Sequence, residues 1–229
     1  MRLFVVSDIH GYAGVLKSTL DNAGFDPADR DHLLVCCGDL FDRGAENLEV
    51  LRFFERLDRK VMIMGNHEER LIQIINSKRL AEHDAISGVF VALREFFGEQ
   101  TIDPERKTVV FSGRDDMIGR IRRLVGDMRD YYETEHYIFV HGWLPNADGA
   151  VLPDWRNASV HQWSDSRKTW WNKGRELSGM KEQKTVICGH YPTPDAGILY
   201  GEGFIALDAG TDISKQINVL VLEDNLMER

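Results

Sequence analysis

The feature that most constrains this chain is a series of short apolar runs separated by segments of helical spacing. The first three apolar runs cover residues 3–6, 32–37 and 61–64. Continuous apolar runs of this length are typical of strands buried on both faces. Segments whose apolar residues follow helical spacing come after each run, at 13–23, 46–57 and 68–76. This alternation predicts an α/β fold in which helices cover a sheet.

The second half of the chain shows the strand pattern again, with little helix between the strands. Its apolar runs predict a second sheet formed by residues 137–140, 185–188, 204–207 and 217–222. A loop-rich stretch at 146–179 separates the first two of these runs. It holds four tryptophans, which we expect to pack in the core: Trp155, Trp163, Trp170 and Trp171.

The middle of the chain, at about 80–135, carries none of the polar clusters described below. Residues 86–97 form one apolar stretch of helical spacing, and 117–124 predict a second helix whose arginines face solvent. We interpret 80–135 as a helical cap inserted into a single domain that spans 1–229.

Composition excludes several classes of function. The chain has 229 residues and a net charge of -9, so it is poorly suited to non-specific binding of nucleic acid or membranes. No apolar stretch reaches the roughly 20 residues of a membrane helix. The three cysteines lie in strand-like runs and indicate buried free thiols in a reducing compartment. We therefore expect a cytoplasmic protein, whose oligomeric state the sequence does not indicate.

Five polar clusters at or just after the ends of apolar runs carry the chemistry. They are Asp8-Ile9-His10-Gly11, Gly38-Asp39-Leu40-Phe41-Asp42-Arg43-Gly44, Gly65-Asn66-His67-Glu68, Val140-His141-Gly142 and Gly189-His190. In an extended strand end, Asp8 and His10 point to the same side, so that one ion can bind both. Asp39 offers two oxygens and is the natural bridge between two ions. Asn66, His141 and His190 complete the ligand set.

This mixture of nitrogen and oxygen ligands indicates the metal. It suits manganese, iron, zinc or nickel better than calcium or magnesium. We expect two divalent ions, with manganese the first candidate and iron, zinc, nickel or magnesium left open. Two ions about 3.5–4 Å apart activate a bridging water and hold phosphoryl oxygens.

Three further residues in these clusters suggest phosphate chemistry. Arg43 can present a guanidinium fork to phosphate oxygens. His67 directly follows Asn66, so its side chain is expected to leave the metal side and to protonate a leaving oxygen as a general acid. Asp42 can hydrogen-bond His67 and favour its cationic form.

The ordered set Asp-x-His-Gly, Gly-Asp-x-x-Asp-Arg-Gly, Gly-Asn-His-Glu, His-Gly and Gly-His resembles the calcineurin-like metallophosphoesterases. Within them it is most similar to the phosphoprotein phosphatase branch of bacterial and phage type. The resemblance covers Asp8 to about Thr211, excluding the cap, and implies a two-sheet β-sandwich flanked by helices. It places Asp8, His10 and Asp39 on one ion. It places Asp39, Asn66, His141 and His190 on the other.

The resemblance also implies an activity. A hydroxide bridging the two ions attacks a phosphomonoester directly, without a covalent intermediate, and Arg43 and His67 bind the phosphate and donate the proton. The expected substrate is a phosphorylated protein, carrying phosphoserine, phosphothreonine or phosphotyrosine, or a small phosphate ester. The family uses a second phosphate-binding arginine, for which Arg167 is the candidate and Arg156 its competitor.

Some residues bear on the choice of substrate. Asp42 stands where symmetrical dinucleoside tetraphosphatases usually lack an acid, which favours a phosphatase. Trp143 and Tyr191 replace the small residue and the threonine that are common in the family, and we expect both at the rim of the site. Asp208 is either a partner of a ligand histidine or a turn-forming residue before glycine.

Two alternative functions remain. A nucleotide hydrolase, such as a dinucleoside tetraphosphatase or a phosphodiesterase, would use the cap and the tryptophans as a base pocket. A non-catalytic module would only recognise phosphate or a partner protein, although every predicted ligand and the predicted acid are present.

Overall fold

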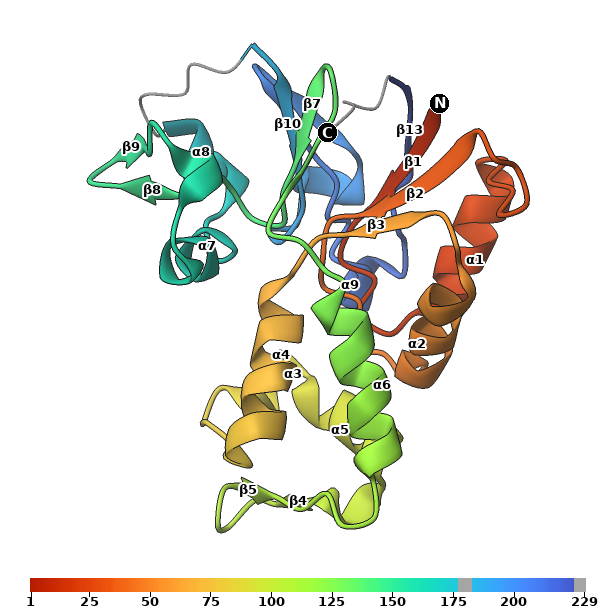
Figure 1. The fold of residues 1–229 in the computed structure, drawn as a ribbon, viewed down its shortest axis with the longest axis vertical. Helices are drawn as coiled ribbons and strands as arrows, with labels where there is room; N and C mark the ends of the chain where they lie inside the picture. The colour runs from red at the N-terminus through yellow and green to blue at the C-terminus, as the bar shows by residue number, and fades with distance from the viewer. Residues whose placement is uncertain (177–182, 225–229) are drawn as a thin grey trace.

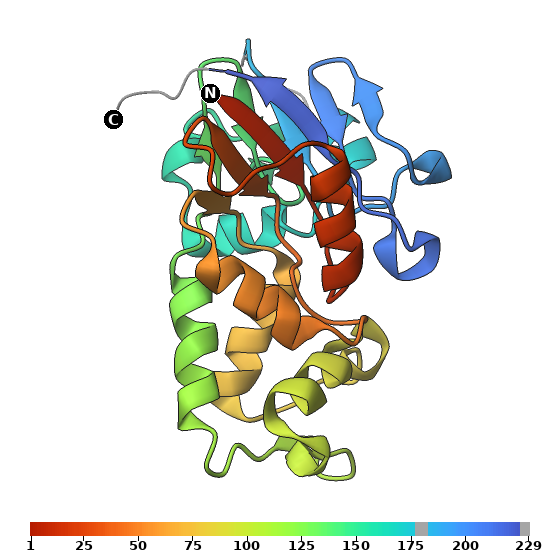
Figure 2. The same cartoon turned by 90° about the vertical axis from the view of Figure 1, so that its right-hand side faces the viewer.

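Two facing sheets with helices on their outer sides form the body of the protein (Figures 1 and 2). The computed structural model describes residues 1–176 and 183–224. The first sheet has the strand order β13-β1-β2-β3. Its strands are β1 (Arg2–Val6), β2 (His32–Cys36), β3 (Lys60–Met62) and β13 (Leu220–Glu223). β1, β2 and β3 run parallel to one another, and β13 is antiparallel to β1.

The second sheet has the strand order β11-β12-β10-β7-β6. Its three central strands are parallel and its two edge strands are antiparallel to their neighbours. The strands are β6 (Tyr132–Glu133), β7 (Tyr137–Phe139), β10 (Thr185–Cys188), β11 (Leu199–Gly201) and β12 (Phe204–Ala206). Two small hairpins lie apart from both sheets: β4 (Ile102–Asp103) with β5 (Thr108–Val109), and β8 (Asn146–Ala147) with β9 (Ala150–Val151).

One strand was assigned to the wrong sheet from the sequence. The run at 217–222 was expected in the second sheet, but β13 pairs with β1 in the first, with Leu3 opposite Leu222 and Val5 opposite Leu220. Its alternating burial resembles that of any edge strand, so the apolar pattern does not reveal its partner. The last strand, β13, therefore lies at the edge of the first sheet beside the first strand of the chain.

Side-chain alternation explains why the central runs are apolar throughout. In β1, Leu3 and Val5 face the second sheet, where they join a cluster with Phe139 and Ile187. Phe4 and Val6, on the opposite face, join the core beneath the helices. The outer face of the second sheet is buried in turn by Trp143, Trp155 and Trp163. The predicted two-sheet sandwich flanked by helices is confirmed.

The helices are α1 (Ala13–Asn22), α2 (Asn47–Arg56), α3 (Asn66–Ser77), α4 (Asp84–Ser87), α5 (Val89–Phe97), α6 (Asp115–Gly126), α7 (Val160–Ser166), α8 (Trp171–Glu176) and α9 (Thr211–Ser214). Helices α3 to α6 form the lower lobe of Figure 1, and α7 and α8 lie on the side of the second sheet. Short 3-10 turns lie at η1 (Glu99–Thr101), η2 (Trp155–Asn157) and η3 (Pro194–Ala196).

The stretch at 86–97 is divided between two helices. Gly88 has φ +90 and ends α4, and α5 then starts at Val89. A Cβ atom at Gly88 would lie 2.7 Å from Cγ of Arg43, so a larger residue does not fit at this close approach. The cap therefore contacts the predicted phosphate-binding arginine.

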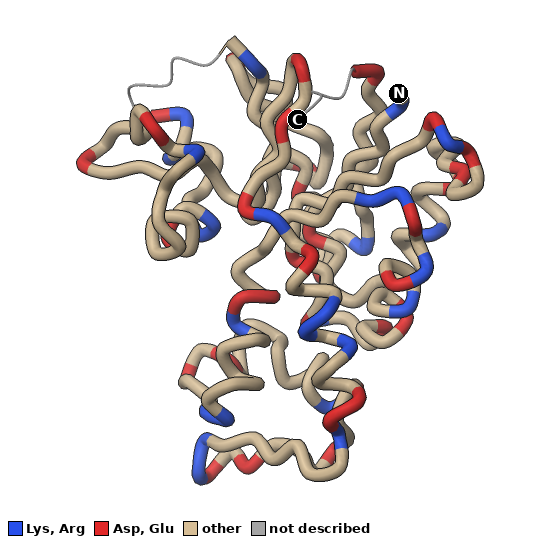
Figure 3. The backbone as a smooth tube through the Cα atoms, in the orientation of Figure 1, with Lys and Arg blue, Asp and Glu red and all other residues tan. Residues whose placement is uncertain are grey.

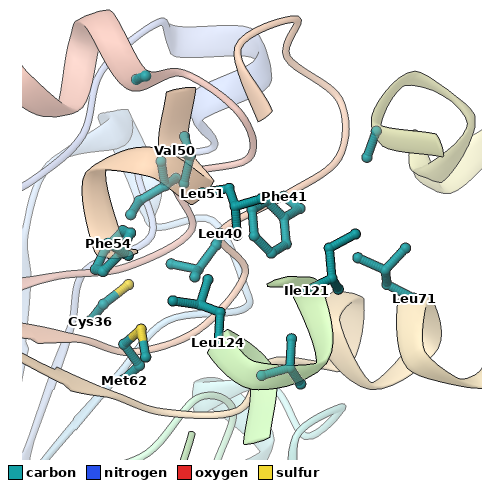
Figure 4. Packing of buried hydrophobic residues seen from close by; sticks show 14 of the residues in the cluster. Cys36, Leu40, Phe41, Val50, Leu51, Phe54, Met62, Leu71, Ile121 and Leu124 are labelled. Atoms are coloured by element: carbon teal, nitrogen blue, oxygen red, sulfur yellow. The ribbon is translucent and has the colours of Figure 1, made fainter. Parts of the chain in front are cut away.

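The core of the lower lobe is continuous with the core above it. Ile121 and Leu124 of α6 lie beside Phe41 and Met62 in one buried cluster (Figure 4). Arg120 of α6, expected in solvent, forms an ion pair with Glu55 of α2. Lys and Arg positions are interspersed with Asp and Glu positions along the chain of the lobe (Figure 3). The prediction of a cap within a single domain stays a prediction.

The tryptophan-rich stretch contains more regular structure than expected. It includes α7, α8 and the β8–β9 hairpin, and its end at 177–179 lies outside the described residues. Trp143 was expected at the rim of the site, but it is buried against Phe204 at 5.9 Å between ring centroids. The physical reason is that the backbone turns at Gly142 and directs the indole into the core of the second sheet. The three cysteines are buried free thiols, as predicted.

Candidate metal centre

The predicted site residues meet at one edge of the sandwich. Asp8 and His10 follow β1, Asp39 follows β2, and Asn66 begins α3 after β3. His141 and His190 follow β7 and β10 of the second sheet, respectively. Because parallel strands end at the same edge of a sheet, loops far apart in the sequence converge there.

The loop backbone is not extended where the side chains converge. Asp8, His10, Asp39 and His190 all have positive φ, at 53, 48, 55 and 69. The expectation that an extended strand end brings Asp8 and His10 together is therefore wrong. Hydrogen bonds between loops hold the strained backbone instead, with the His10 amide donating to the Asp39 carbonyl at 3.0 Å.

The side chain of Asp39 lies at the centre of the site. Its Oδ2 atom is 3.8 Å from Nε2 of His10 and 3.4 Å from Nε2 of His141. Potential ligand atoms of Asp39, His141 and His190 lie within 4.8 Å of one another, as do those of His10, Asp39 and His67. Asp39 thus belongs to both groups, as a bridging carboxylate must.

Backbone carbonyls fix the orientation of two ligand histidines. Nδ1 of His10 donates to the Phe41 carbonyl at 3.0 Å, and Nδ1 of His141 donates to the Cys37 carbonyl at 2.7 Å. With Nδ1 occupied in this way, Nε2 of each ring faces the centre and is the atom available to a metal. Nε2 of His141 also lies 2.9 Å from Oδ1 of Asn66.

Burial and charge in this site fit a pair of cations. Asp8 and Asp39 are only 1% and 2% exposed. Burial raises the pKa of Asp8 to about 6, although the charge of His141 acts against it. Burial acts in the same direction on Asp39, but the charges of His141 and His67 outweigh it and hold the pKa of Asp39 well below its usual range. Two buried carboxylates facing imidazole nitrogens are a suitable donor set for divalent ions.

Glu68 has a structural role that was not predicted from the sequence. Its buried carboxylate accepts hydrogen bonds from the amides of Asp39 at 2.9 Å and Leu40 at 2.8 Å. It also accepts one from the amide of Gly65 at 3.2 Å, so that the side chain at the third position of α3 satisfies the amide of the residue before the helix. Glu68 therefore holds the β2 and β3 loops together. Its position three residues after Gly65 is the signal that indicates this role.

His67 and Asp42 form a short hydrogen-bonded pair. Nδ1 of His67 donates to Oδ2 of Asp42 at 2.6 Å, and Oδ1 of Asp42 has no partner among the described residues. The His67 side chain was expected to leave the metal side, but its Nε2 atom lies 3.8 Å from Oδ2 of Asp39. Burial lowers the pKa of His67, yet the charge of Asp39 and the bond to Asp42 raise it to about 9.

Arg43 directly follows Asp42 in the chain and is partly exposed. Its Nη1 atom donates to Oδ1 of Asp212 in α9 at 3.1 Å. Helix α9 is held against the loop that carries Asp8, because Oγ1 of Thr211 donates to the Asp8 carbonyl at 2.7 Å. Asp212 is thus a neighbour of the site for which the sequence carries no local signal.

The two candidates for a second phosphate-binding arginine are both held by carboxylates. Arg167 is buried and ion-paired with Glu69 at 3.1 Å and with Asp130. Arg156 forms an ion pair with Glu133 at 2.7 Å. The assignment of Arg167 stays a prediction. Asp208 accepts a hydrogen bond from the Gly210 amide, as a turn-forming residue does.

A cavity of about 430 Å³ opens beside the predicted acid. It is lined on the metal side by Asp42, Asn66 and His67. Arg70 and His83 line it farther out, together with Lys168. The cavity provides room for a substrate whose phosphate reaches the metal ligands.

Comparison with known proteins agrees with this geometry. The sequence profile of the family described as calcineurin-like phosphoesterase matches residues 1–218. The chain belongs to this family. It is therefore a hydrolase of the metallophosphoesterase family, and the family and the ligand groups together indicate a dinuclear site for divalent metal ions. Among the described residues, no helix is long and apolar enough to cross a membrane.

Curated relatives carry one recurring name. A symmetrical bis(5'-nucleosyl)-tetraphosphatase of Aromatoleum aromaticum is 28% identical over 210 residues, which cover 85% of this chain and 69% of the relative. The protein of the same name from Pseudomonas fluorescens strain SBW25 is 37% identical over 94 residues, which cover 40% of this chain and 32% of the relative. The alignment to the Pseudomonas protein thus spans about a third of that protein's length.

Solved structures of similar fold carry different names. A provisionally assigned diadenosine tetraphosphatase has a TM-score of 0.63 and 18% identity, with 96% of this chain and 89% of that chain covered. The cold-active protein-tyrosine phosphatase of a Shewanella species has a TM-score of 0.58 and 17% identity, with coverage of 98% and 76%. At these identities the likeness establishes the fold alone.

Proposed function

We propose that the protein hydrolyses phosphate monoesters in a metal-dependent reaction, with phosphorylated serine, threonine or tyrosine residues as the substrate class. The observation that carries this proposal is the 2.6 Å bond between His67 and Asp42, with Nε2 of His67 directed toward the metal ligands. A buried carboxylate favours the cationic imidazole, and the cation is the form that donates a proton.

Six side chains would hold two divalent ions: Asp8, His10, Asp39, Asn66, His141 and His190. When bound, such ions lower the pKa of a coordinated water and neutralise phosphate charge. Manganese is the first candidate because the set mixes imidazole with carboxylate and amide oxygens. Arg43 keeps donors that Asp212 does not engage, so its guanidinium can orient a phosphate at the mouth of the site.

The leaving group explains the value of a proton donor here. The alkoxide released from a serine or threonine ester is strongly basic, so protonation by His67 stabilises it as the bond breaks. A nucleoside diphosphate leaves as a weakly basic anion and gains little from an acid. The His67–Asp42 pair thus favours ester over anhydride cleavage.

A second candidate function is the hydrolysis of dinucleoside polyphosphates. It is favoured by the Aromatoleum aromaticum relative, whose similarity extends over 85% of this chain. The metal ligands and Arg43 would serve either reaction, since both cleave a P–O bond with water.

Rates on two substrates distinguish the candidates. We expect the manganese-supplied protein to release phosphate from a phosphoserine peptide with a higher kcat/KM than that for cleavage of diadenosine tetraphosphate. A higher kcat/KM on diadenosine tetraphosphate would replace the first candidate with the second. Absence of hydrolysis of both, and of para-nitrophenyl phosphate, would contradict both candidates.

A further inference from the structure

The segment 166–174 lies between the two histidine loops of the second sheet. The Trp143 amide donates to the Ser166 carbonyl at 3.0 Å, which attaches the segment to the His141 loop. On the other side, Nε1 of Trp171 donates to the Tyr191 carbonyl at 3.1 Å, which attaches it to the His190 loop. The segment is therefore held in place beside two predicted metal ligands.

Two lysines of this segment line a second pocket next to the metal centre. Lys168 and Lys173 both line a cavity of about 420 Å³, together with Asn146, Thr169 and Trp170. Lys168 also lines the cavity beside His67, so the two cavities share a wall at this side chain. Neither lysine is ion-paired with any carboxylate in the described part of the chain.

Trp170 offers a flat aromatic surface in the same pocket. Its ring stacks on Tyr191 with centroids 4.5 Å apart and an interplanar angle of 13°. Stacking covers one face of the indole, and 45% of the residue is still exposed to solvent. Exposed tryptophans that line a pocket beside cations are suited to bind an aromatic ring of a charged ligand.

From this arrangement we propose that Lys168, Trp170 and Lys173 form a nucleotide-binding subsite, with the two lysines binding a phosphate chain and Trp170 stacking on the base. The phosphate chain of a nucleoside polyphosphate would run from the metal centre past Lys168 into the second pocket. The proposal rests on the second candidate function and names the residues that would select a nucleotide.

A nucleotide fits these features better than a phosphopeptide does. An acidic peptide would use the two lysines, but it has no constant aromatic ring that would require the Trp170–Tyr191 stack. A nucleoside polyphosphate carries both the negative charges and a planar base in one small molecule. The dimensions agree as well, since each cavity is a few hundred Å³, the usual size of a small-molecule site.

Binding of two non-hydrolysable probes to the manganese-loaded protein tests this subsite. The probes are α,β-methylene-ADP and methylenediphosphonate, which share the phosphonate chain and differ in the nucleoside. We expect calorimetry to show that wild-type protein binds α,β-methylene-ADP at least about tenfold more tightly, because stacking on a base supplies this preference. Trp170→Ala should abolish the preference, and Trp170→Phe should retain part of it.

Lys173→Gln should weaken the binding of both probes by a similar factor, since it removes a contact to the shared phosphonate chain. Tyr200→Ala and Lys17→Gln are matched controls, because both residues are exposed and neither lines the two cavities. Thermal unfolding and hydrolysis of para-nitrophenyl phosphate establish that each variant is folded and holds metal.

Equal affinity of wild-type protein for the two probes would overturn the subsite, as would a nucleoside preference that persists in Trp170→Ala. Tighter binding of an acidic phosphopeptide that depends on Trp170 would overturn the nucleotide assignment. If the manganese-loaded wild-type protein did not hydrolyse para-nitrophenyl phosphate, the proposed function would be contradicted instead. The failures of the two proposals are thus distinguishable.

Discussion

Replacing Asp42 by asparagine tests the proton donor without changing the shape of the site. The backbone amide of Asp42 donates to Oδ1 of Asn47 at 2.7 Å, and this bond does not involve the side chain. The substitution removes the charge 2.6 Å from Nδ1 of His67 and leaves a neutral amide in its place. Metal ligation is not affected directly, since Asp42 is not among the predicted ligands.

The expected effect follows from the pKa of His67. Burial lowers this pKa, while the charge of Asp39 and the bond to Asp42 raise it from 6.5 to about 9. His67 is therefore a cation below about pH 9 and loses its proton above it. Asp42 supplies both a hydrogen bond and a charge that raise this pKa, so its replacement lowers the pKa. If the pKa falls from about 9 to 6.5 in the variant, the cationic fraction at pH 8 falls from about 0.9 to about 0.03.

The assay compares an alkyl and an aryl ester across pH. On a phosphoserine peptide at pH 8, Asp42→Asn should lower kcat by about 30-fold, and by less than about twofold at pH 5.5. On para-nitrophenyl phosphate, whose leaving group is weakly basic, the loss should be small at both pH values. His67→Asn sets the lower limit, with a loss of about 10²–10⁴ on the alkyl ester at every pH. An equal loss on both esters, or an unchanged pH profile, would refute the acid role of His67.

Two further predictions concern ion pairs near and far from the site. Asp212→Asn should lower the Ki of inorganic phosphate by about two- to fivefold in inhibition assays. The ion pair with Arg43 is partly exposed and contributes at most about 1 kcal/mol, and its loss frees guanidinium donors for phosphate. An increase in Ki would show that Asp212 mainly orients Arg43. Glu133→Gln should lower the free energy of unfolding at pH 7 by about 1–2 kcal/mol, measured in urea titrations. The reason is that hydrogen bonds from Arg156 and Lys184 outweigh burial and lower the pKa of the Glu133 carboxyl to about 2. The stabilisation from this lowered pKa is complete above 4.5, the pKa of Glu133 in the unfolded chain, and is lost as the pH falls toward 2. If the difference in free energy of unfolding between wild type and variant grew below pH 4.5, the role of Glu133 would be contradicted.

The sequence was most informative where a strand runs directly into a ligand. The strands that end near Asp8, Asp39 and His141 are buried on both faces. Such strands are continuous apolar runs, which can be recognised in the sequence without knowing which strands pair. Pairing between distant strands is not encoded in this way, which is why β13 was assigned to the second sheet. The wrong expectation for His67 has a similar cause, since its position depends on the loop after β2, where its amide donates to Asp39 and its ring to Asp42.

Local sequence patterns also could not predict which side chains from distant loops contact each other. Arg43 and Asp212 are 169 residues apart and meet only through α9. Trp143 follows a ligand histidine in sequence, yet the turn at Gly142 directs it into the core. Residues whose role depends on the path of a loop thus required the structure.

Metal binding by the wild-type protein and an Asp39→Asn variant tests the central claim most directly. The metal-stripped proteins would be dialysed against manganese, bound manganese counted by mass spectrometry, and para-nitrophenyl phosphate hydrolysis measured on the same samples. A bridging Asp39 predicts two manganese ions per wild-type chain, with hydrolysis that returns as the second ion binds, and one ion or none in the inactive variant. Two tightly bound ions in the variant, or full wild-type activity with a single ion, would contradict the account.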